Sequence, residues 1–506
     1  MAFKNTSDVV AFSRYVAFFK LLHLTKTIKF VFGSSMQNFH RIRHFLYSLL
    51  RTFAPHFYLK IHSNYKHMKK TFLLFSLTAL FSGVSLAQNI KFVEYDLPNG
   101  LKVLLHEDHT TPIVAVSVMY HVGSKNEKPQ RSGFAHFFEH LLFEGSANIK
   151  RGEFDDYVNN AGGMNNANTT YDRTYYYEVL PSNQLGLGLW LESERMLHAS
   201  VDKVGVETQR QVVKEERRMR YDNQPYGKLL EETLKRLYTT HPYKSSVIGS
   251  MEDLDAAQEI DYKTFYKDFY RPDNAILSIA GDLDIEQTKK LIDLYFKDIP
   301  SGKGEIQRKF PQEPAITKVR RDTVYDNIQL PAVILAYHIP AQGTKDIYAV
   351  KMLGMVLSQG ESSRMQKSIV DEQQKAVFAG SFPLELEDPG ANICFGIANL
   401  GVDVADLEKS MDAVISEVQT NLISEEEFQK LQNQVENDFI SANNSVAGIA
   451  ENLAQYEMYY GDANLINTEL ERYRKVTRED IRAAAIKYFN KNARVVLHWL
   501  PQPAKP

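Results

Sequence analysis

Two histidines and a glutamate lie close together in the stretch SGFAHFFEHLLFEG, residues 132–145. A helix would place His136 and His140 one turn apart on the same face, where two ring nitrogens can bind one tetrahedral ion. Glu139 would lie beside them. A zinc ion held by two histidines and one carboxylate keeps its fourth position for water, and a second carboxylate can take a proton from that water. The spacing therefore predicts a hydrolytic zinc centre; the alternative is a buried histidine pair in a phenylalanine-rich helix.

The third metal ligand is expected on a second helix over residues 204–221, which offers Glu215 and Glu216. Glu216 shares its helical face with the apolar residues Val212, Val213 and Met219, whereas Glu215 has polar neighbours. An apolar face should turn toward the core, so we choose Glu216. The alternative is an ordinary charged surface helix without a ligand.

The elements around these residues read as a mixture of strands and helices. Segments 90–95 and 101–106 flank Asn99-Gly100, a strong hairpin signal. Further strands are predicted at 113–121, 164–170 and 174–180, and a helix at 154–160. This irregular alternation favours the α+β class, with helices covering a mainly antiparallel sheet.

The chain is long enough for more than one hydrophobic core. DYKTFYKDFYRPDNAIL at 261–277 can be aligned with DIRAAAIKYFNKNARVV at 480–496, so the same helix-strand unit should occur in both halves. The stretch from residue 300 to 316 is rich in Gly, Pro and charged residues and shows no sustained period, so a linker is predicted there. We therefore expect a metal-binding domain over 88–299 and a second, similar domain over 317–506.

The first 87 residues differ from the rest. Residues 1–67 are basic and aromatic without a clear period, and they are expected to be a non-native extension. From Met68 the chain has two lysines, an apolar run and Ser-Leu-Ala before Gln88, which is typical of a secretory signal peptide over 68–87. A membrane anchor in the prefix is the alternative. The mature chain is expected in the periplasm or outside the cell, without a stable membrane span.

Charge and cysteine content narrow the possible functions. After residue 87 the chain holds 47 Lys and Arg against 61 Asp and Glu, a net charge of −14 that gives no basis for nucleic-acid binding. Cys394 is the lone cysteine, so an internal disulfide and a cysteine zinc site are both excluded.

Four motifs in order closely resemble those of the pitrilysin or insulinase family of zinc peptidases, whose His-x-x-Glu-His order is the inverzincin signature. They are HFFEH at 136–140, GGMNNANT at 162–169, WLESERM at 190–196 and RQVVKEE at 210–216. The resemblance covers essentially all of residues 90–506. The length is that of two-domain members such as mitochondrial processing peptidase subunits and their bacterial relatives, each of which forms half of a peptidase clamshell.

The resemblance implies a zinc endopeptidase that cuts extended peptides or unfolded protein segments. One zinc ion per chain would be held by His136, His140 and Glu216, with Glu139 as general base. Asn166 and Ala167 would contact a substrate that pairs with their strand by β-augmentation. A non-catalytic scaffold or peptide-binding subunit that keeps the fold is the alternative function.

Two departures from the family pattern bear on turnover. Many family members have a glutamate seven residues before the third ligand that helps to orient the histidines, and here Gln209 stands at that position and brings no charge. In the second half, Arg364 matches an arginine that contacts substrate, but Val377 stands where a tyrosine would stabilise the oxyanion. Because a two-domain chain forms only half of a clamshell, we expect a dimer. The partner would be a related subunit that supplies an Arg and Tyr pair or, alternatively, a second copy of this chain.

Overall fold

The computed structural model describes residues 89–503. The expected extension at 1–67 and the expected signal peptide at 68–87 lie outside the described residues. Within 89–503, no helix combines the length and apolar character that crossing a bilayer demands.

The first half forms a six-stranded sheet in the order β1-β2-β6-β3-β5-β4. Neighbouring strands are antiparallel except for β2 and β6, which are parallel. Strand β4 lies at one edge of this sheet, and within residues 89–503 no strand pairs with its outer side. The strands are β1 (Val93–Asp96), β2 (Lys102–Glu107), β3 (Ile113–Tyr120), β4 (Met164–Thr169), β5 (Thr174–Pro181) and β6 (Ala275–Gly281).

The second half forms a five-stranded sheet in the order β7-β11-β8-β10-β9. Only β7 and β11 are parallel among these neighbours. The strands are β7 (Arg320–Asp326), β8 (Ala332–His338), β9 (Ala376–Leu384), β10 (Ala391–Ala398) and β11 (Val495–Pro501). Since β2 to β6 and β7 to β11 follow the same order and directions, the two halves are repeats, and the predicted α+β class with two similar units is confirmed.

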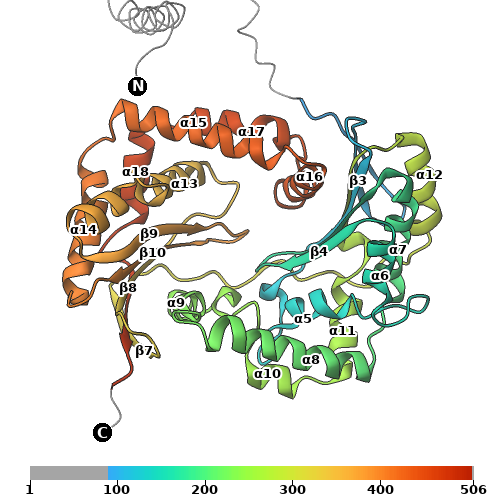
Figure 1. Ribbon diagram of the computed structural model, residues 1–506, viewed down its shortest axis with the longest axis horizontal. Coiled ribbons are helices and arrows are strands. Elements are labelled where there is room, and N and C mark those ends of the chain that lie inside the picture. Colours follow the sequence, from blue (N-terminus) through green and yellow to red (C-terminus); the bar gives the residue numbers. More distant parts are fainter. Residues whose placement is uncertain (1–88, 504–506) are drawn as a thin grey trace, which may run out of the picture. The chain divides into compact units, whose positions relative to one another are not determined.

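Helices pack against the sheet in both halves (Figure 1). The first half contains α5 (Phe134–Leu141), α6 (Glu153–Asn160), α7 (Leu185–His198), α8 (Lys203–Arg217), α9 (Leu229–Leu237), α10 (Met251–Ala256), α11 (Glu259–Phe269) and α12 (Ile285–Phe296). The second contains α13 (Lys345–Ser358), α14 (Val404–Thr420), α15 (Glu425–Ala442), α16 (Val446–Tyr460), α17 (Leu465–Arg474) and α18 (Arg478–Tyr488). The predicted repeat unit is α11 with β6 in one half and α18 with β11 in the other.

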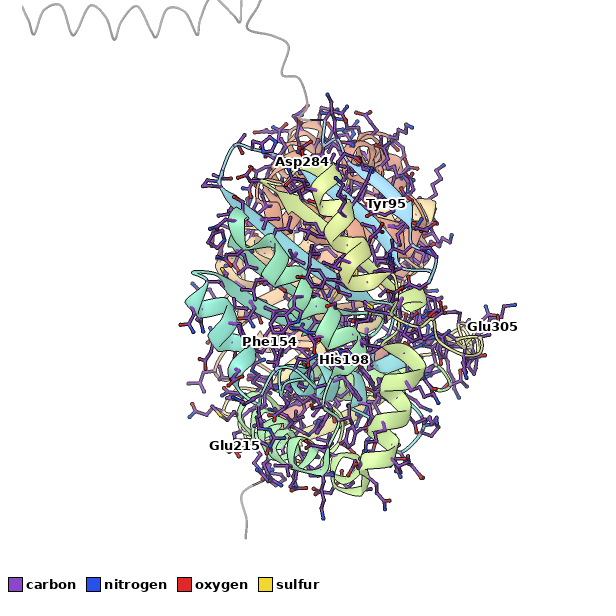
Figure 2. All side chains as sticks on the ribbon, turned by 90° about the vertical axis from the view of Figure 1, so that its right-hand side faces the viewer. Tyr95, Phe154, His198, Glu215, Asp284 and Glu305 are labelled. Carbon is purple, nitrogen blue, oxygen red and sulfur yellow. The ribbon has the colours of Figure 1, made fainter. Side chains whose placement is uncertain are left out.

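Side chains alternate between the two faces along a strand, and each sheet contributes buried residues to a core on both of its faces. In β3, Val114, Val116 and Val118 face the core under the first-half helices, whereas Ala115 and Met119 face the opposite side. Figure 2 views the first half from the side on which α6, α7 and α12 cover the sheet.

The two halves exchange one helix each. Helix α16 of the second half packs on β3 and β6 through Leu453 and its neighbours, and α9 of the first half packs on β8 and β11 through Leu234 and Leu237. The exchange is reciprocal, because α9 and α16 are each the third α-helix after the fourth strand of their repeat, β5 in the first half and β10 in the second. Neither half buries its sheet without a helix of the other.

The segment from 300 to 316 contains no helix or strand. It lies between α12 and β7, where the linker is expected. The boundaries at 88–299, 300–316 and 317–506 remain our proposal.

Candidate metal centre

Three expected ligands meet between two helices. His136 and His140 project from α5, and Glu216 lies next to the last residue of α8. Glu216 Oε2 lies 3.5 Å from His136 Nε2 and 3.1 Å from His140 Nε2. A ligand atom from each of the three residues lies within 4.8 Å of the other two. The tertiary fold thus brings together the pair and the carboxylate that the sequence separates by 76 positions.

Helix α5 begins without a side-chain cap of its own. Gly133 has a φ of 87°, and a Cβ there would lie 2.7 Å from the Ile248 carbonyl oxygen, so only glycine fits. The Glu127 carboxylate accepts hydrogen bonds from the backbone N–H groups of Gly133 and Ala135, at 2.8 and 2.9 Å. A residue from the preceding loop therefore caps the helix that carries both histidines.

The ionisation of these groups suits a metal ligand set. Burial lowers the pKa of His136 to about 4, and the nearby His140 acts in the same direction. Burial opposes ionisation of Glu216, but its hydrogen bond with His140 and the two nearby rings lower its pKa. At neutral pH His136 is thus a neutral imidazole and Glu216 a carboxylate, the forms that bind zinc.

The donor set matches that of catalytic zinc sites. Two imidazole nitrogens and one carboxylate oxygen converge, and within residues 89–503 no fourth His, Cys, Asp or Glu completes the group. Three protein ligands leave one position open. The buried Nδ1 of His136 has no hydrogen-bond partner in this part of the chain, while its Nε2 is the atom turned toward Glu216.

Glu139 lies on the same helix as the histidines and is half-buried. Burial raises the pKa of its carboxyl, whereas the hydroxyl of Thr169 on β4 and the charge of His140 oppose this shift. A carboxylate with a raised pKa is a stronger base near neutral pH. Glu139 can therefore accept a proton beside the ligand set.

Glu216 lies at the predicted place, but the apolar face that was expected to turn it inward is only partly buried. Val213 is fully buried, whereas Val212 is 43% exposed and Met219 is 60% exposed, so these residues form no continuous inward face. Glu215 lies on the outer side of α8, paired with Arg218 (Figure 2). The inward turn of Glu216 comes from its position opposite α5.

Arg220 is a further residue of the site that was not predicted from the sequence. Its Nη1 lies 2.8 Å from Glu216 Oε1, so the two carboxylate oxygens have different partners. Arg220 follows Glu216 by one helical turn, and this i,i+4 spacing is the signal that would have found it.

Gln209 does not contact either histidine. Its Nε2 donates a hydrogen bond to the buried carboxylate of Glu144, at 2.5 Å, and Arg151 pairs with the other oxygen of Glu144. The Oε1 of Gln209 is buried without a partner among the described residues. The negative charge that is absent at position 209 is therefore present next to it, at Glu144.

The two expected substrate contacts lie on the edge strand β4. Asn166 Oδ1 accepts a hydrogen bond of 2.8 Å from the N–H of Ala167. That N–H is thus not used in the β4–β5 ladder. It lies on the unpaired edge, where an added strand would find a donor.

Arg364 is not brought to the ligand set. Its guanidinium makes two hydrogen bonds to Glu427 and an ion pair with Glu417, all within the second half. Val377, near the start of β9, is 50% exposed. These contacts leave Arg364 engaged with acidic side chains of its own half.

Two family models match the chain. Residues 102–250 match the model described as Insulinase (Peptidase family M16), and residues 261–435 match Peptidase M16 inactive domain. His136, Glu139, His140 and Glu216 all lie in the first match. The Zinc protease PqqE of Helicobacter pylori is 33% identical over 363 residues, which is 71% of this chain and 82% of that protein.

Solved structures show the same fold. A protease from Helicobacter pylori matches with a TM-score of 0.78 and 30% identity, over 81% of this chain and 100% of that one. The periplasmic protease PqqL from Escherichia coli matches with a TM-score of 0.67 and 19% identity, over 82% of this chain and 48% of that one. With its sequence relatives, its family matches and its fold in agreement, this chain belongs to peptidase family M16, the insulinase family.

Proposed function

We propose that this protein is a zinc-dependent endopeptidase that hydrolyses extended peptides or unfolded protein segments. The observation that carries the proposal is the convergence of His136, His140 and Glu216 beside Glu139. A scaffold has no need for three ligand atoms and a base in one place.

His136 and His140 would hold zinc through Nε2, and Glu216 through Oε2. Zinc held there would act as a Lewis acid toward the scissile carbonyl and would lower the pKa of bound water. Glu139 takes a proton from the attacking water and passes it to the leaving amine. Its half-buried carboxyl, with a raised pKa, is suited to holding that proton between the two transfers.

The edge of β4 would hold the substrate. A peptide in extended conformation would add to the sheet as a further strand. Its backbone carbonyl would accept the hydrogen bond that the Ala167 N–H now donates to Asn166. Main-chain pairing of this kind binds many sequences and requires an unfolded segment. The proposed substrate class follows from this requirement.

The second family description, with its inactive domain, favours a non-catalytic role as the second candidate. That match spans 261–435, however, and includes none of the proposed zinc ligands. An inactive second half beside a complete first half is compatible with catalysis.

The test is zinc content and peptide cleavage of purified protein. The wild type should bind one zinc and cleave a peptide library until a chelator is added. Glu139→Gln should keep the metal and lose cleavage, because it is no ligand, whereas His136→Ala, His140→Ala and Glu216→Ala should lose both. Cleavage by Glu139→Gln at the wild-type rate would refute the mechanism, and a zinc-loaded wild type without activity would favour the scaffold.

We also propose export to the periplasm, the compartment named for the Escherichia coli relative. Mass spectrometry of the exported protein should find Gln88 at or near its N-terminus. Recovery of peptides from residues 1–60 would contradict both the Met68 start and the signal peptide.

We further propose a dimer. The match covers only 48% of PqqL, so the single chain of that relative is about twice as long as the matched part of this chain. A second subunit would supply the remaining half, either a related chain with an intact Arg and Tyr pair or another copy of this one.

A further inference from the structure

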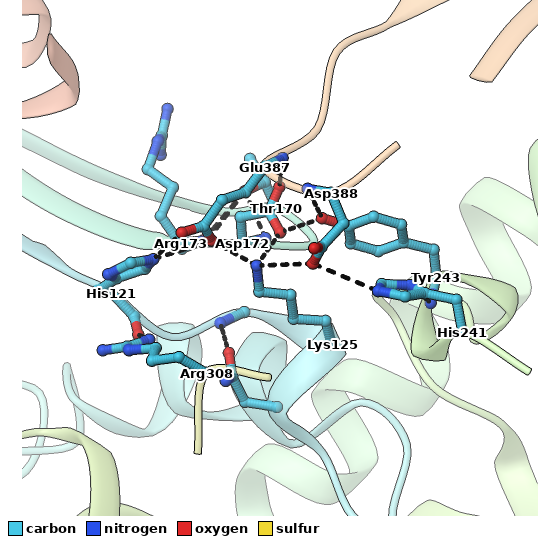
Figure 3. Close-up of polar contacts among 12 residues, drawn as sticks. His121, Lys125, Thr170, Asp172, Arg173, His241, Tyr243, Arg308, Glu387 and Asp388 are labelled. Atoms are coloured by element: carbon cyan, nitrogen blue, oxygen red, sulfur yellow. Dashed lines mark hydrogen bonds and ion pairs between the residues drawn. The ribbon is translucent and has the colours of Figure 1, made fainter. Parts of the chain in front are cut away.

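A buried lysine lies where the two halves meet. Lys125 follows β3, and its side chain is 2% exposed. Its ammonium lies 2.9 Å from Asp172, 3.6 Å from Asp388, and also contacts Glu387 (Figure 3). Asp172 belongs to the first half, whereas Glu387 and Asp388 belong to the second. One cation thus binds carboxylates from both.

The three carboxylates come from equivalent turns of the repeat. Asp172 lies between β4 and β5, and Glu387 and Asp388 lie between β9 and β10. The two turns are also joined directly, since the Glu387 N–H donates to Asp172 at 3.0 Å. Tyr243 donates its hydroxyl proton to Asp172 at 2.6 Å and accepts from the Asp388 N–H at 3.1 Å.

Lys125 contacts all three carboxylates of this joint. Three carboxylates surround one ammonium, and the two outer carboxylates each face a histidine: Glu387 faces His121 at 3.0 Å, and Asp388 faces His241 at 3.3 Å. Without the ammonium, the buried Asp172 carboxylate would face Glu387 and Asp388, whose side chains are 29% and 35% exposed, and like charges this close are unfavourable. We call Lys125, Asp172, Tyr243, Glu387, Asp388, His121 and His241 the Lys125 joint.

The joint is connected to both parts of the proposed active site. The backbone N–H groups of Ser124 and Lys125 bond to the carbonyls of Thr170 and Tyr171, just after the edge strand β4. Two residues beyond Lys125, Glu127 caps the helix that carries the histidines. A shift at Lys125 would therefore reach β4 and α5 together.

We propose that Lys125 is a positioning residue that holds the β9–β10 turn of the second half against the β4–β5 turn of the first. Its consequence for catalysis rests on the proposed peptidase function, because the loop of Lys125 bonds to the residues just after β4, the strand that would hold the peptide. The joint itself does not rest on that function.

The spacing of the halves is measured by spin-label distances on the full chain. Labels at Leu294→Cys on α12 and Leu400→Cys after β10 report it, since both side chains are highly exposed and Cys394 is buried. Lys125→Met should broaden the distance distribution and shift it to longer values, and Lys125→Arg should restore it. Lys125→Met/Glu387→Gln should recover part of the shift, because it removes one of the unbalanced charges.

Lys102→Met is the matched control. Lys102 also contacts three carboxylates, one of them on α16, but its side chain is 26% exposed and it lies on β2. Lys102→Met should leave the distance between the two spin labels unchanged. An unchanged distribution in Lys125→Met, or the same shift in both variants, would overturn the proposal. If Lys125→Met does not fold, Glu387→Gln/Asp388→Asn tests the joint from the other side and should broaden the distribution.

Enzyme kinetics complete the test. Lys125→Met should raise KM roughly 10- to 100-fold, because the substrate would be misplaced. Its affinity for zinc should not change. A fall in kcat with loss of zinc would instead indicate a general structural role and overturn the proposal. Absence of activity in every variant, with the distance shift present, would refute the peptidase function and leave the joint standing.

Discussion

The two oxygens of Glu216 have separate tasks. Oε2 faces both histidines, while Oε1 is paired with Arg220. When one oxygen of a carboxylate is held by an ion pair, its other oxygen points in a fixed direction. Residues that contact metal ligands orient the ligands in this way. Arg220 is 74% exposed, so water screens the pair and its contribution is modest.

Arg220→Ala should therefore weaken zinc binding less than about tenfold, below the range for buried outer partners, and competition with a chelating dye measures it. Arg218→Ala is the control, since Arg218 pairs with Glu215 outside the ligand set. Equal affinities in the two variants would show that Arg220 does not orient Glu216.

Position 209 shows that a family pattern does not transfer one residue at a time. The resemblance suggests that a glutamate there would improve the site. In this chain Gln209 donates to a Glu144 carboxylate that is 7% exposed, and a second carboxylate would face the first in a buried place.

Gln209→Glu should therefore lower Tm at pH 7, with partial recovery at pH 5, where one carboxyl of the pair takes up a proton. Gln211→Glu is the matched control, because Gln211 makes the same contact with Glu207 at the exposed surface of the same helix. A Gln209→Glu protein as stable as wild type, with tighter zinc binding, would support the family pattern instead.

At the scale of elements, α5 depends on the loop before it. The helix is eight residues long, which is too short to be stable alone, and its first N–H groups are satisfied by Glu127. Capping of this kind typically contributes about 1 kcal/mol.

Glu127→Ala should speed hydrogen exchange in residues 134–141 and weaken zinc binding, with Glu127→Gln intermediate because its amide oxygen still accepts. The control is Ser250→Ala, which removes the cap of α10, a helix without ligands. Unchanged exchange in α5 would mean that tertiary packing alone holds the helix.

At the scale of the whole molecule, the exchange of α9 and α16 joins the halves through their cores, and the Lys125 joint adds a charged contact. Burial opposes ionisation of Glu387, but its hydrogen bond with His121 and the charges of His121 and Lys125 lower its pKa to about 2. The folded pKa is below the ordinary 4.5, so this carboxylate stabilises the fold above about pH 4.5. Its contribution disappears as the pH falls toward 2.

Glu387→Gln should therefore lower the free energy of unfolding at pH 7, by at most about 3 kcal/mol, and the difference from wild type should shrink between pH 5 and pH 3. Urea titrations at several pH values measure it. Glu286→Gln, at a site 75% exposed beside Lys289, should show no such dependence. A difference that stays constant with pH would contradict the assignment.

The proposed partner is a second prediction at this scale. The chain alone should bind zinc but cleave slowly, and Val377→Tyr should raise its rate if the missing hydroxyl limits turnover. Sedimentation and peptide cleavage test this, with Val204→Tyr, at an exposed valine of the first half, as control. Full activity of the isolated wild type, unchanged by Val377→Tyr, would refute the partner.

Features that depend on neighbours along the chain could be predicted from the sequence alone. Helical spacing placed His136, Glu139 and His140 together, and Asn99-Gly100 marked the hairpin of β1 and β2. The aligned segments at 261–277 and 480–496 predicted the repeat that the two sheets display. These features follow from periodicity and turn chemistry, which act over a few residues.

Which distant groups share a site could not be predicted from the sequence and became known from the fold. The face of α8 that turns inward, the bond from Gln209 to Glu144 and the acidic partners of Arg364 depend on how helices pack. The meeting of Lys125 with Glu387 joins residues 262 positions apart. No local pattern encodes such contacts, because burial and charge pairing are settled by the packing of whole elements, and a side chain's partner is whatever that packing brings within reach.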